Sequence, residues 1–167
     1  ERANLTFDDT VVVAGCGPIG LGMVAGARAK SPARIIALDL AEDKLALALR
    51  CGADLALNVA ETDVVAAIKE LTGGYGADVY LEGTGHPSAV GQGLSLLRKL
   101  GTYVEYSVFG SDVTVDWSII SDDKELDVRG AHLGPHTWPA AVRMLESEIL
   151  PMAGICSHQL ALGDFQR

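Results

Sequence analysis

The stretch that decides the fold lies near the start of the chain, where residues 10–20 read TVVVAGCGPIG. Its run of three valines predicts a buried strand, and the glycines at positions 15, 17 and 20 follow that strand in the spacing GxGxxG. Small residues suited to a helix continue from Pro18, a residue that is favoured in the first helical turn. A strand, a glycine-rich turn and a helix in this order are typical of the first unit of a Rossmann-type fold.

The glycine spacing also has a chemical meaning. Gly15 permits a tight turn, Gly17 lets the backbone approach a pyrophosphate, and Gly20 lets helix and strand pack closely. The helix N-terminus then offers free N–H groups and a partial positive charge to phosphates. Together with Pro18 and Ile19, these glycines form the predicted pyrophosphate site of a dinucleotide. A purely structural turn is the alternative reading of the same residues.

Asp39 decides between two dinucleotides. It follows a second apolar run, about 20 positions beyond Gly20. A carboxylate at this place accepts hydrogen bonds from the adenosine ribose and repels a 2′-phosphate, and Leu40 follows in place of an arginine that would bind that phosphate. The sequence therefore favours NAD(H) over NADP(H). Asp39 is also consistent with a cap of the next helix, a role compatible with the first.

Apolar runs and helical patterns alternate along the whole chain. Strands are expected at residues 10–14, 34–38, 54–57, 77–81, 101–106 and 126–131, with short extra strands at 112–115 and 155–160. Helices are expected at residues 18–30, 42–51, 62–71, 87–97, 117–121 and 138–148, the last one capped by Thr137. This alternation predicts an α/β fold with a Rossmann-type, doubly wound, parallel six-stranded sheet.

A second glycine turn marks the other half of the predicted site. Residues 82–85 read EGTG after the fourth strand, and residues 106–108 read YSV after the fifth. Ligands of doubly wound sheets bind beyond the carboxyl ends of the strands, at the switch point of the strand order. Thr84 and Gly85, with Ser107 and Val108, are therefore expected to flank the nicotinamide half of the cofactor. For Thr84, a helix cap is an equally good interpretation.

Composition narrows the classes of function. Apolar residues make up 49% of the chain and aromatic residues only 5%, which suits an aliphatic core on both faces of a parallel sheet. A net charge of −9 argues against nucleic acid and anionic membranes as partners, and no apolar run approaches the roughly 18 residues of a membrane span. Cys16, Cys51 and Cys156 form no CxxC pair, so a reducing cytoplasm is the expected location.

Other chemistries fit the residues less well. Gly20 is followed by Leu21 rather than by the lysine that a nucleotide triphosphate loop requires. Two alternatives remain. One is a methyltransferase, although the acidic residue expected just before its loop is absent. The other is a non-catalytic nucleotide-sensing module. No metal site is predicted. Cys156 and His158 lie on one apparent strand, a glycine and a proline separate His132 from His136, and no fourth ligand is evident.

Several segments together carry a resemblance to a known family. They are residues 13–21, 37–40 with Lys44, 49–54, 81–85, 136–139 and 158–160. In these segments the chain resembles the cofactor domain of zinc-dependent medium-chain dehydrogenases. Within that family it is most similar to sorbitol dehydrogenase-like polyol enzymes, including the bacterial erythritol/threitol type. The likeness covers nearly the whole chain.

The resemblance implies that Asp39 and Lys44, beside Leu40, bind the adenosine ribose of NAD(H), and that His132 and Leu133 line the nicotinamide pocket with residues 107–108. It implies hydride transfer between a zinc-bound alcohol or polyol and NAD. The zinc ligands would belong to a catalytic domain outside this chain. Residues 1–154 are then the NAD(H)-binding domain, and residues 155–167 begin the return to the catalytic domain.

The ends of the chain, a first residue Glu1 and a last segment inside an expected helix, agree with an excised domain. We therefore expect the fragment to contain no catalytic residues and to be inactive alone. Residues 112–115, which resemble the part of the family that joins two subunits, lead us to expect a homo-oligomer, a dimer or a tetramer.

Overall fold

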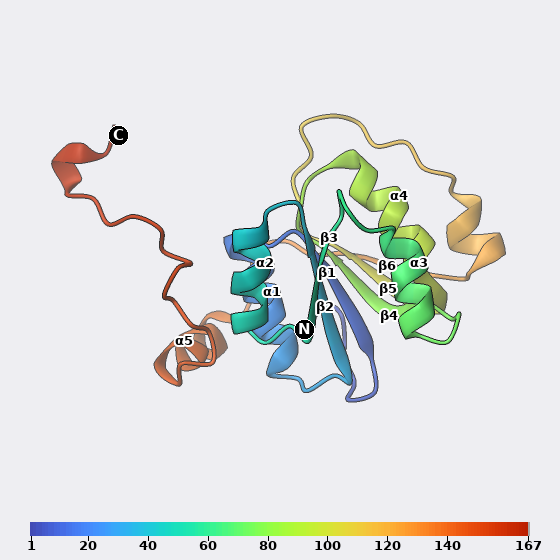
Figure 1. The fold of residues 1–167 in the computed structure, drawn as a ribbon, viewed down its shortest axis with the longest axis horizontal. Helices are drawn as coiled ribbons and strands as arrows, with labels where there is room; N and C mark the ends of the chain where they lie inside the picture. Colours follow the sequence, from blue (N-terminus) through green and yellow to red (C-terminus); the bar gives the residue numbers. More distant parts are fainter. Residues whose placement is uncertain (167) are drawn as a thin grey trace.

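The computed structural model describes residues 1–166 and contains one six-stranded sheet with the strand order β3-β2-β1-β4-β5-β6 (Figure 1). Every pair of neighbouring strands is parallel. The strands are β1 (Thr10–Ala14), β2 (Arg34–Asp39), β3 (Leu55–Asn58), β4 (Ala77–Glu82), β5 (Leu97–Glu105) and β6 (Asp127–Gly130). The predicted Rossmann-type sheet is thus confirmed, and the strand order reverses between β1 and β4.

Helices cover both faces of the sheet, with α1 and α2 on one side and α3 and α4 on the other (Figure 1). The α-helices are α1 (Pro18–Arg28), α2 (Glu42–Arg50), α3 (Val64–Leu71), α4 (Pro87–Leu96) and α5 (Trp138–Glu146). A π-helix, η1 (Ile119–Asp123), and a 3₁₀ turn, η2 (Leu162–Asp164), complete the described elements. The segment after α5 ends away from the sheet, near the C-terminus of the chain (Figure 1).

The central strand shows why the core is aliphatic. Val11 and Val13 of β1 belong to the cluster packed against α1 and α2, whereas Val12 and Ala14 belong to the cluster packed against α3 and α4. All four side chains are almost completely buried. A strand covered on both faces needs apolar residues at consecutive positions, which explains the unbroken run in the sequence.

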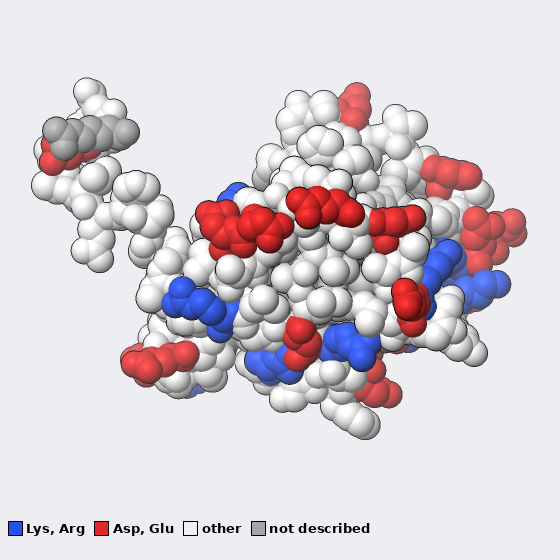
Figure 2. All heavy atoms as spheres, viewed as in Figure 1, with Lys and Arg blue, Asp and Glu red and all other residues white. Residues whose placement is uncertain are grey.

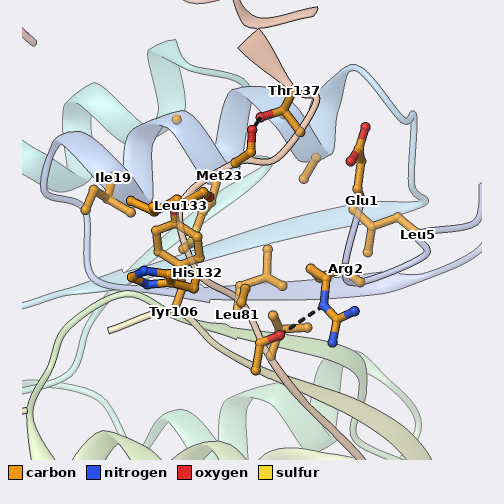
Figure 3. A pocket seen from close by; sticks show the side chains of 18 of the residues that line it. Glu1, Arg2, Leu5, Ile19, Met23, Leu81, Tyr106, His132, Leu133 and Thr137 are labelled. Atoms are coloured by element: carbon orange, nitrogen blue, oxygen red, sulfur yellow. Dashed lines mark hydrogen bonds between the residues drawn. The ribbon is translucent and has the colours of Figure 1, made fainter. Parts of the chain in front are cut away.

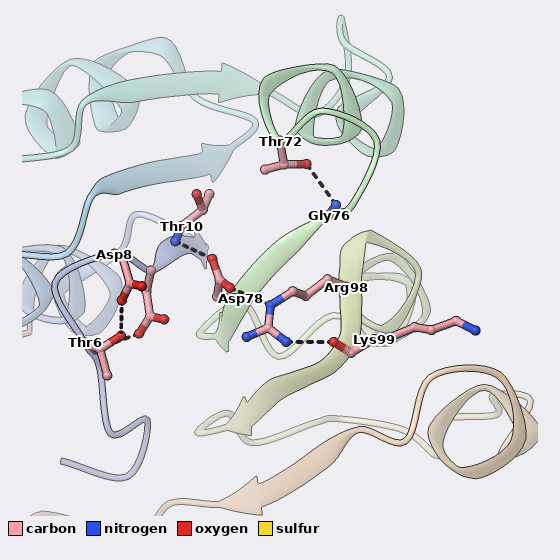
Figure 4. Close-up of polar contacts among 9 residues, drawn as sticks. Thr6, Asp8, Thr10, Thr72, Gly76, Asp78, Arg98 and Lys99 are labelled. Atoms are coloured by element: carbon pink, nitrogen blue, oxygen red, sulfur yellow. Dashed lines mark hydrogen bonds and ion pairs between the residues drawn. The ribbon is translucent and has the colours of Figure 1, made fainter.

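A polar network holds the amino ends of three strands together (Figure 4). Asp78 accepts a 2.7 Å hydrogen bond from the Thr10 amide of β1, and its other carboxylate oxygen lies 2.5 Å from Nε of Arg98 in β5. Arg98 also donates to the carbonyl of Lys99 at 2.7 Å. This network lies at the edge opposite to the glycine turns and fixes the register of the central strands.

Lys124 closes the carboxyl end of α4. Its ammonium group donates hydrogen bonds of 2.7 Å each to the carbonyls of Leu94, Ser95 and Leu97, which lack helical partners at a helix end. Burial lowers the pKa of Lys124, because the charged form loses hydration. One cation thus replaces the usual glycine cap.

Two local predictions are wrong, and two others are confirmed only in part. Residues 112–115 and 155–160 form no strands, because no other described segment pairs with them apart from an isolated bridge between Ala153 and Cys156. The expected helix at 117–121 is the π-helix η1. Thr137 is the N-cap residue of α5, as predicted, but its side chain makes no capping hydrogen bond to the helix; its hydroxyl donates to the carbonyl of Gly134 at 2.8 Å. A β-branched pattern alone does not make a strand without a partner.

The surface in Figure 2 shows acidic side chains interspersed with lysines and arginines, and this face carries no continuous basic patch. Within residues 1–166, none of the helices has both the length and the apolar content to cross a bilayer. Neither observation assigns a function, and the site has to be sought at the carboxyl ends of the strands.

Candidate functional site

The glycine turn between β1 and α1 is held at the seam where the strand order reverses. Gly15 has a φ of +86°, and its amide donates a 2.8 Å hydrogen bond to the carbonyl of Leu38. A Cβ at this position would lie 2.9 Å from the carbonyl oxygen of Gly83. At Gly20 a Cβ would lie 1.7 Å from the carbonyl oxygen of Gly15. Both positions therefore require glycine for the turn itself.

The start of α1 offers an anion site. Gly17 is the N-cap residue and Pro18 is the first helical residue, and no side chain caps the free N–H groups of the first turn. A Cβ on Gly17 would meet nothing within 4 Å, so the space beside this backbone is open. Unsatisfied N–H groups beside open space form the arrangement that binds a pyrophosphate.

Asp39 connects the glycine turn to the end of β2. Its Oδ2 accepts a 2.6 Å hydrogen bond from the Cys16 amide, and its Oδ1 accepts hydrogen bonds from the amides of Leu40 and Ala41 at 2.8 and 3.0 Å. The N-cap of α2 is Ala41, so the alternative role of Asp39 as that helix cap is wrong. Leu40 and Lys44 are exposed beside it. The carboxylate thus lies where a ribose bound next to the turn would meet it.

The second half of the predicted site comes together around a cavity of about 190 Å³. Its lining consists of Ile19, Gly83, Thr84, Gly85, Tyr106, Ser107 and Val108. His132 and Leu133 lie instead along a larger, apolar groove of about 910 Å³ beside it (Figure 3). Ile19 and Tyr106 border both hollows, and the Tyr106 hydroxyl donates a 2.8 Å hydrogen bond to the carbonyl of Leu133. The expected nicotinamide residues are therefore neighbours.

Thr84 is not the helix cap that the sequence left open as an alternative. The N-cap of α4 is His86, whose ring accepts a hydrogen bond from the Ser88 amide at 3.3 Å. The Thr84 hydroxyl accepts from the His86 amide at 2.9 Å and donates to Glu82. Its position is thus set by the strand end before it.

Glu82 was not predicted from the sequence as a site residue, although it holds the residues that line this cavity. Glu82 is fully buried, and it accepts hydrogen bonds from the amides of Thr84 and Gly85 at 2.8 and 3.3 Å and from the hydroxyls of Thr84 and Ser107. An acid at a strand end looks like a surface residue in a sequence. The signal that could have revealed it is the repeat VYLE and TYVE, in which two aliphatic strands end on glutamate.

The thiol of Cys16, inside the glycine turn, is expected to be unreactive. Burial, followed by the charge of Asp39, raises the pKa of the Cys16 thiol to about 12. Cys51 is also buried, whereas Cys156 is exposed, and all three are free thiols. Cys16 therefore serves as an apolar filler whose backbone amide, rather than its sulfur, contacts Asp39.

The described residues do not fit a metal centre. Within residues 1–166, no group of three or more histidine, cysteine, aspartate or glutamate side chains lies close enough together to hold an ion. A catalytic zinc needs about three protein ligands and one open position.

The parallel sheet, the glycine turn at its switch point and the acid at the end of β2 define a Rossmann-type dinucleotide-binding domain. The sequence profile of the zinc-binding dehydrogenases matches residues 18–147, and the chain belongs to that family. It is 74% identical over all of its 167 residues to an erythritol/L-threitol dehydrogenase of Mycolicibacterium smegmatis, of which it covers 46%. The chain thus spans about half the length of this curated relative.

Two solved structures of the same fold carry cofactors. An alcohol dehydrogenase from Escherichia coli complexed with NADH is 25% identical, with a TM-score of 0.80 over 89% of this chain and 43% of the other. A zinc-binding dehydrogenase from Sinorhizobium meliloti bound to NADP is 27% identical, with a TM-score of 0.83 over 90% of this chain and 45% of the other. Both nicotinamide dinucleotides thus occur among similar structures.

Proposed function

We propose that this chain is the NAD(H)-binding part of a zinc-dependent dehydrogenase that oxidises an alcohol or a polyol. The observation that carries the proposal is the hydrogen bond from the Cys16 amide to Asp39, which places a carboxylate beside an uncapped helix N-terminus. The family assignment and the identity to an erythritol/L-threitol dehydrogenase support the substrate class. Membership of that family argues against the methyltransferase alternative.

Each part of the cofactor has a candidate position. The pyrophosphate would lie against the start of α1 at Gly17, and the adenosine ribose against Asp39, with Leu40 and Lys44 beside it. The nicotinamide would lie in the cavity bordered by Thr84, Gly85, Ser107 and Val108, with His132 and Leu133 beyond it. When bound, the nicotinamide ring would accept or donate the hydride, while these residues hold it and exclude water.

Asp39 supports NAD(H) as the cofactor. One carboxylate oxygen accepts from Cys16 in the glycine turn and the other from Leu40 and Ala41 after β2, so the charge would be held where a 2′-phosphate would arrive. No arginine stands next to it, since Leu40 and Ala41 follow. Repulsion between two anions at this short range disfavours NADP(H).

The test is a titration of the 167-residue chain with NADH and with NADPH, followed by nicotinamide fluorescence and by the shift in melting temperature. We expect saturable NADH binding and weaker NADPH binding, and loss of that preference in Asp39→Ala. Asp43→Ala is the matched control, because Asp43 is an exposed acid in the first turn of α2. A folded chain that binds neither dinucleotide would refute the proposal.

We propose that the zinc ligands and the catalytic residues lie outside these 167 residues, so that the chain binds cofactor without turnover. Three free thiols support a reducing, cytoplasmic location. A homo-oligomer is supported by residues 112–115, of which 112 and 114 are exposed, and by the outer edge of β6, which pairs with no further strand within residues 1–166. Light scattering of the chain at micromolar concentration tests this proposal.

A further inference from the structure

Glu82 and Glu105 end neighbouring parallel strands in the same register. Glu82 of β4 pairs with Glu105 of β5, just as Tyr80 pairs with Tyr103 two positions earlier. Residues in register on adjacent strands point to the same face, and the two tyrosine rings do stack there, with centroids 5.3 Å apart. The two carboxyl groups are therefore side by side at the carboxyl edge of the sheet, under the 190 Å³ cavity.

Ser107 connects both acids. Its hydroxyl donates to Oε2 of Glu82, and its amide donates a 2.8 Å hydrogen bond to Oε1 of Glu105. Glu82 also holds Thr84 and Gly85 on the other side of the cavity. The two acids thus fix both turns that border the candidate nicotinamide position, although neither acid lines the cavity itself.

Within residues 1–166, no cation forms an ion pair with either acid that would balance two negative charges. The three ion pairs among residues 1–166 involve neither acid. From β4 and β5 the pair faces Tyr80 and Tyr103. From β1 it faces Ala14, the register partner of Glu82, and β6 places Gly130 beside Glu105. The one titratable group at the start of α4, His86, is exposed and bonded to Ser88.

The two acids accept different numbers of hydrogen bonds. Glu82 accepts from four donors, which satisfy a carboxylate, whereas Glu105 accepts only from the Tyr103 hydroxyl at 3.1 Å and from Ser107. Burial, followed by the charge of Glu82, raises the pKa of Glu105 above its ordinary range, and the donors at Ser107 and Tyr103 only oppose this in part. Two neighbouring carboxyl groups, one fully buried and one half-buried, favour a state with one proton, which the smaller number of donors at Glu105 assigns to Glu105.

We propose that Glu82 and Glu105 form a positioning pair that holds one proton between them and thereby fixes Ser107 and the EGTG turn for the nicotinamide end of the cofactor. The role in cofactor binding rests on the proposed function. Loss of the proton places two like charges side by side and disfavours the closed arrangement of the Ser107 turn. NADH affinity consequently falls as the pH rises through the titration of Glu105.

The first experiment needs no cofactor. Carboxyl ¹³C NMR of the glutamate-labelled 167-residue chain should show Glu105 titrating above the ordinary value of about 4.3. Amide exchange at Ser107 should accelerate beyond the intrinsic pH dependence over the same range. Ordinary titration of Glu105 would overturn the shared proton, whatever the chain binds.

The second experiment measures the NADH dissociation constant against pH. In the unaltered chain it should rise through the Glu105 titration, by at most about tenfold per pH unit for one proton. Glu105→Gln keeps a donor toward Glu82 and should abolish this dependence. Glu105→Ala leaves Ser107 and Tyr103 without their acceptor and should weaken binding at every pH. Glu61→Gln, at an exposed position, is the control for the change of charge.

The outcomes separate the two proposals. NADH binding whose pH profile is the same in the unaltered chain and in Glu105→Gln would overturn the positioning pair and leave the cofactor assignment standing. A folded chain that binds no NADH would refute the cofactor assignment, and the NMR titration would still decide whether the pair holds its proton and fixes Ser107.

Discussion

The backbone amide of Cys16 and the carboxylate of Asp39 are joined by a 2.6 Å hydrogen bond that crosses from the glycine turn to the end of β2. The candidate sites for the pyrophosphate and for the ribose are therefore parts of one rigid unit. Any substitution of Asp39 changes two things, the charge offered to a ribose and the support of the turn.

Two substitutions at Asp39 separate these effects. Asp39→Asn keeps one oxygen that can accept from Cys16, but its Nδ2 then faces the amides of Leu40 and Ala41. We therefore expect a smaller loss of stability than in Asp39→Ala, together with loss of the preference for NADH over NADPH. Asp39→Ala removes the acceptor as well and should lower the free energy of unfolding by about 1–3 kcal/mol. Urea unfolding and cofactor titration of both variants measure the two effects. Equal stability of the two variants would show that the hydrogen bond to Cys16 contributes nothing.

The glycines of α1 and its turn should respond differently to alanine. Gly20→Ala forces a Cβ against the Gly15 carbonyl and should destabilise the fold by more than about 2 kcal/mol. Gly22→Ala meets open space within the helix and should stabilise it by about 0.5–1 kcal/mol.

Gly17→Ala, at the open N-cap of α1, should change stability by less than about 1 kcal/mol while raising the NADH dissociation constant at least about tenfold. Thermal unfolding and NADH titration measure both quantities. Normal NADH binding by Gly17→Ala would contradict a pyrophosphate at this backbone.

The network around Asp78 should support stability without affecting the site. Asp78→Asn weakens the bonds to Thr10 and Arg98 at the edge opposite to the glycine turns, and we expect a loss of about 1–3 kcal/mol in the free energy of unfolding. NADH affinity at temperatures well below unfolding should stay unchanged. Asp43→Asn, on the exposed start of α2, is the matched control. A selective loss of NADH affinity in Asp78→Asn would show that the two edges are coupled.

The three cysteines should differ in reactivity. With a pKa of about 12 for Cys16, only about one thiol in ten thousand is ionised at pH 8, and burial also blocks access. We expect a maleimide to label exposed Cys156 rapidly, and to label Cys16 and Cys51 only after denaturation. Peptide mass spectrometry after timed labelling measures this. Rapid native labelling of Cys16 would mean that the glycine turn opens often.

Glu105 should also make stability depend on pH. Its pKa is raised in the folded protein, so the folded state holds more protons than the unfolded state between the ordinary value of about 4.3 and the raised one. The free energy of unfolding should therefore fall as the pH rises through this interval. The variant Glu105→Gln should lack that part of the slope, whereas Glu61→Gln should retain it. If the free energy of unfolding changed with pH in the same way in the unaltered chain and in Glu105→Gln, the prediction would be wrong.

Local signals explain which parts of the fold the sequence predicted well. The run ending at Ala14, the proline at 18 and the glycine at 52 each act over a few residues, and β1, the start of α1 and the end of α2 lie where they indicate. The segment 112–115 failed because a strand depends on a partner elsewhere in space.

The candidate site also combines features that have a local sequence signal with features that depend on distant parts of the chain. Gly15–Gly20 and Asp39 are recognisable from spacing alone, and the structure places them in contact. The link between Glu82 and Glu105 depends on the register of two strands, and the support of α4 by Lys124 depends on a contact across 30 positions. Neither relationship has a local signature, so sequence reasoning could not supply it.

The seam between β1 and β4 has a consequence for how the protein folds. Thr10 and Asp78, which meet there, are 68 positions apart, whereas β1, β2 and β3 are joined by short connections. Closing the longer loop costs more entropy, so we expect the first three strands to associate early and the seam to close late. During synthesis, the hollow that would receive the nicotinamide cannot exist until the second half of the chain has docked. A ligand present at that moment would stabilise the last step of folding rather than the first.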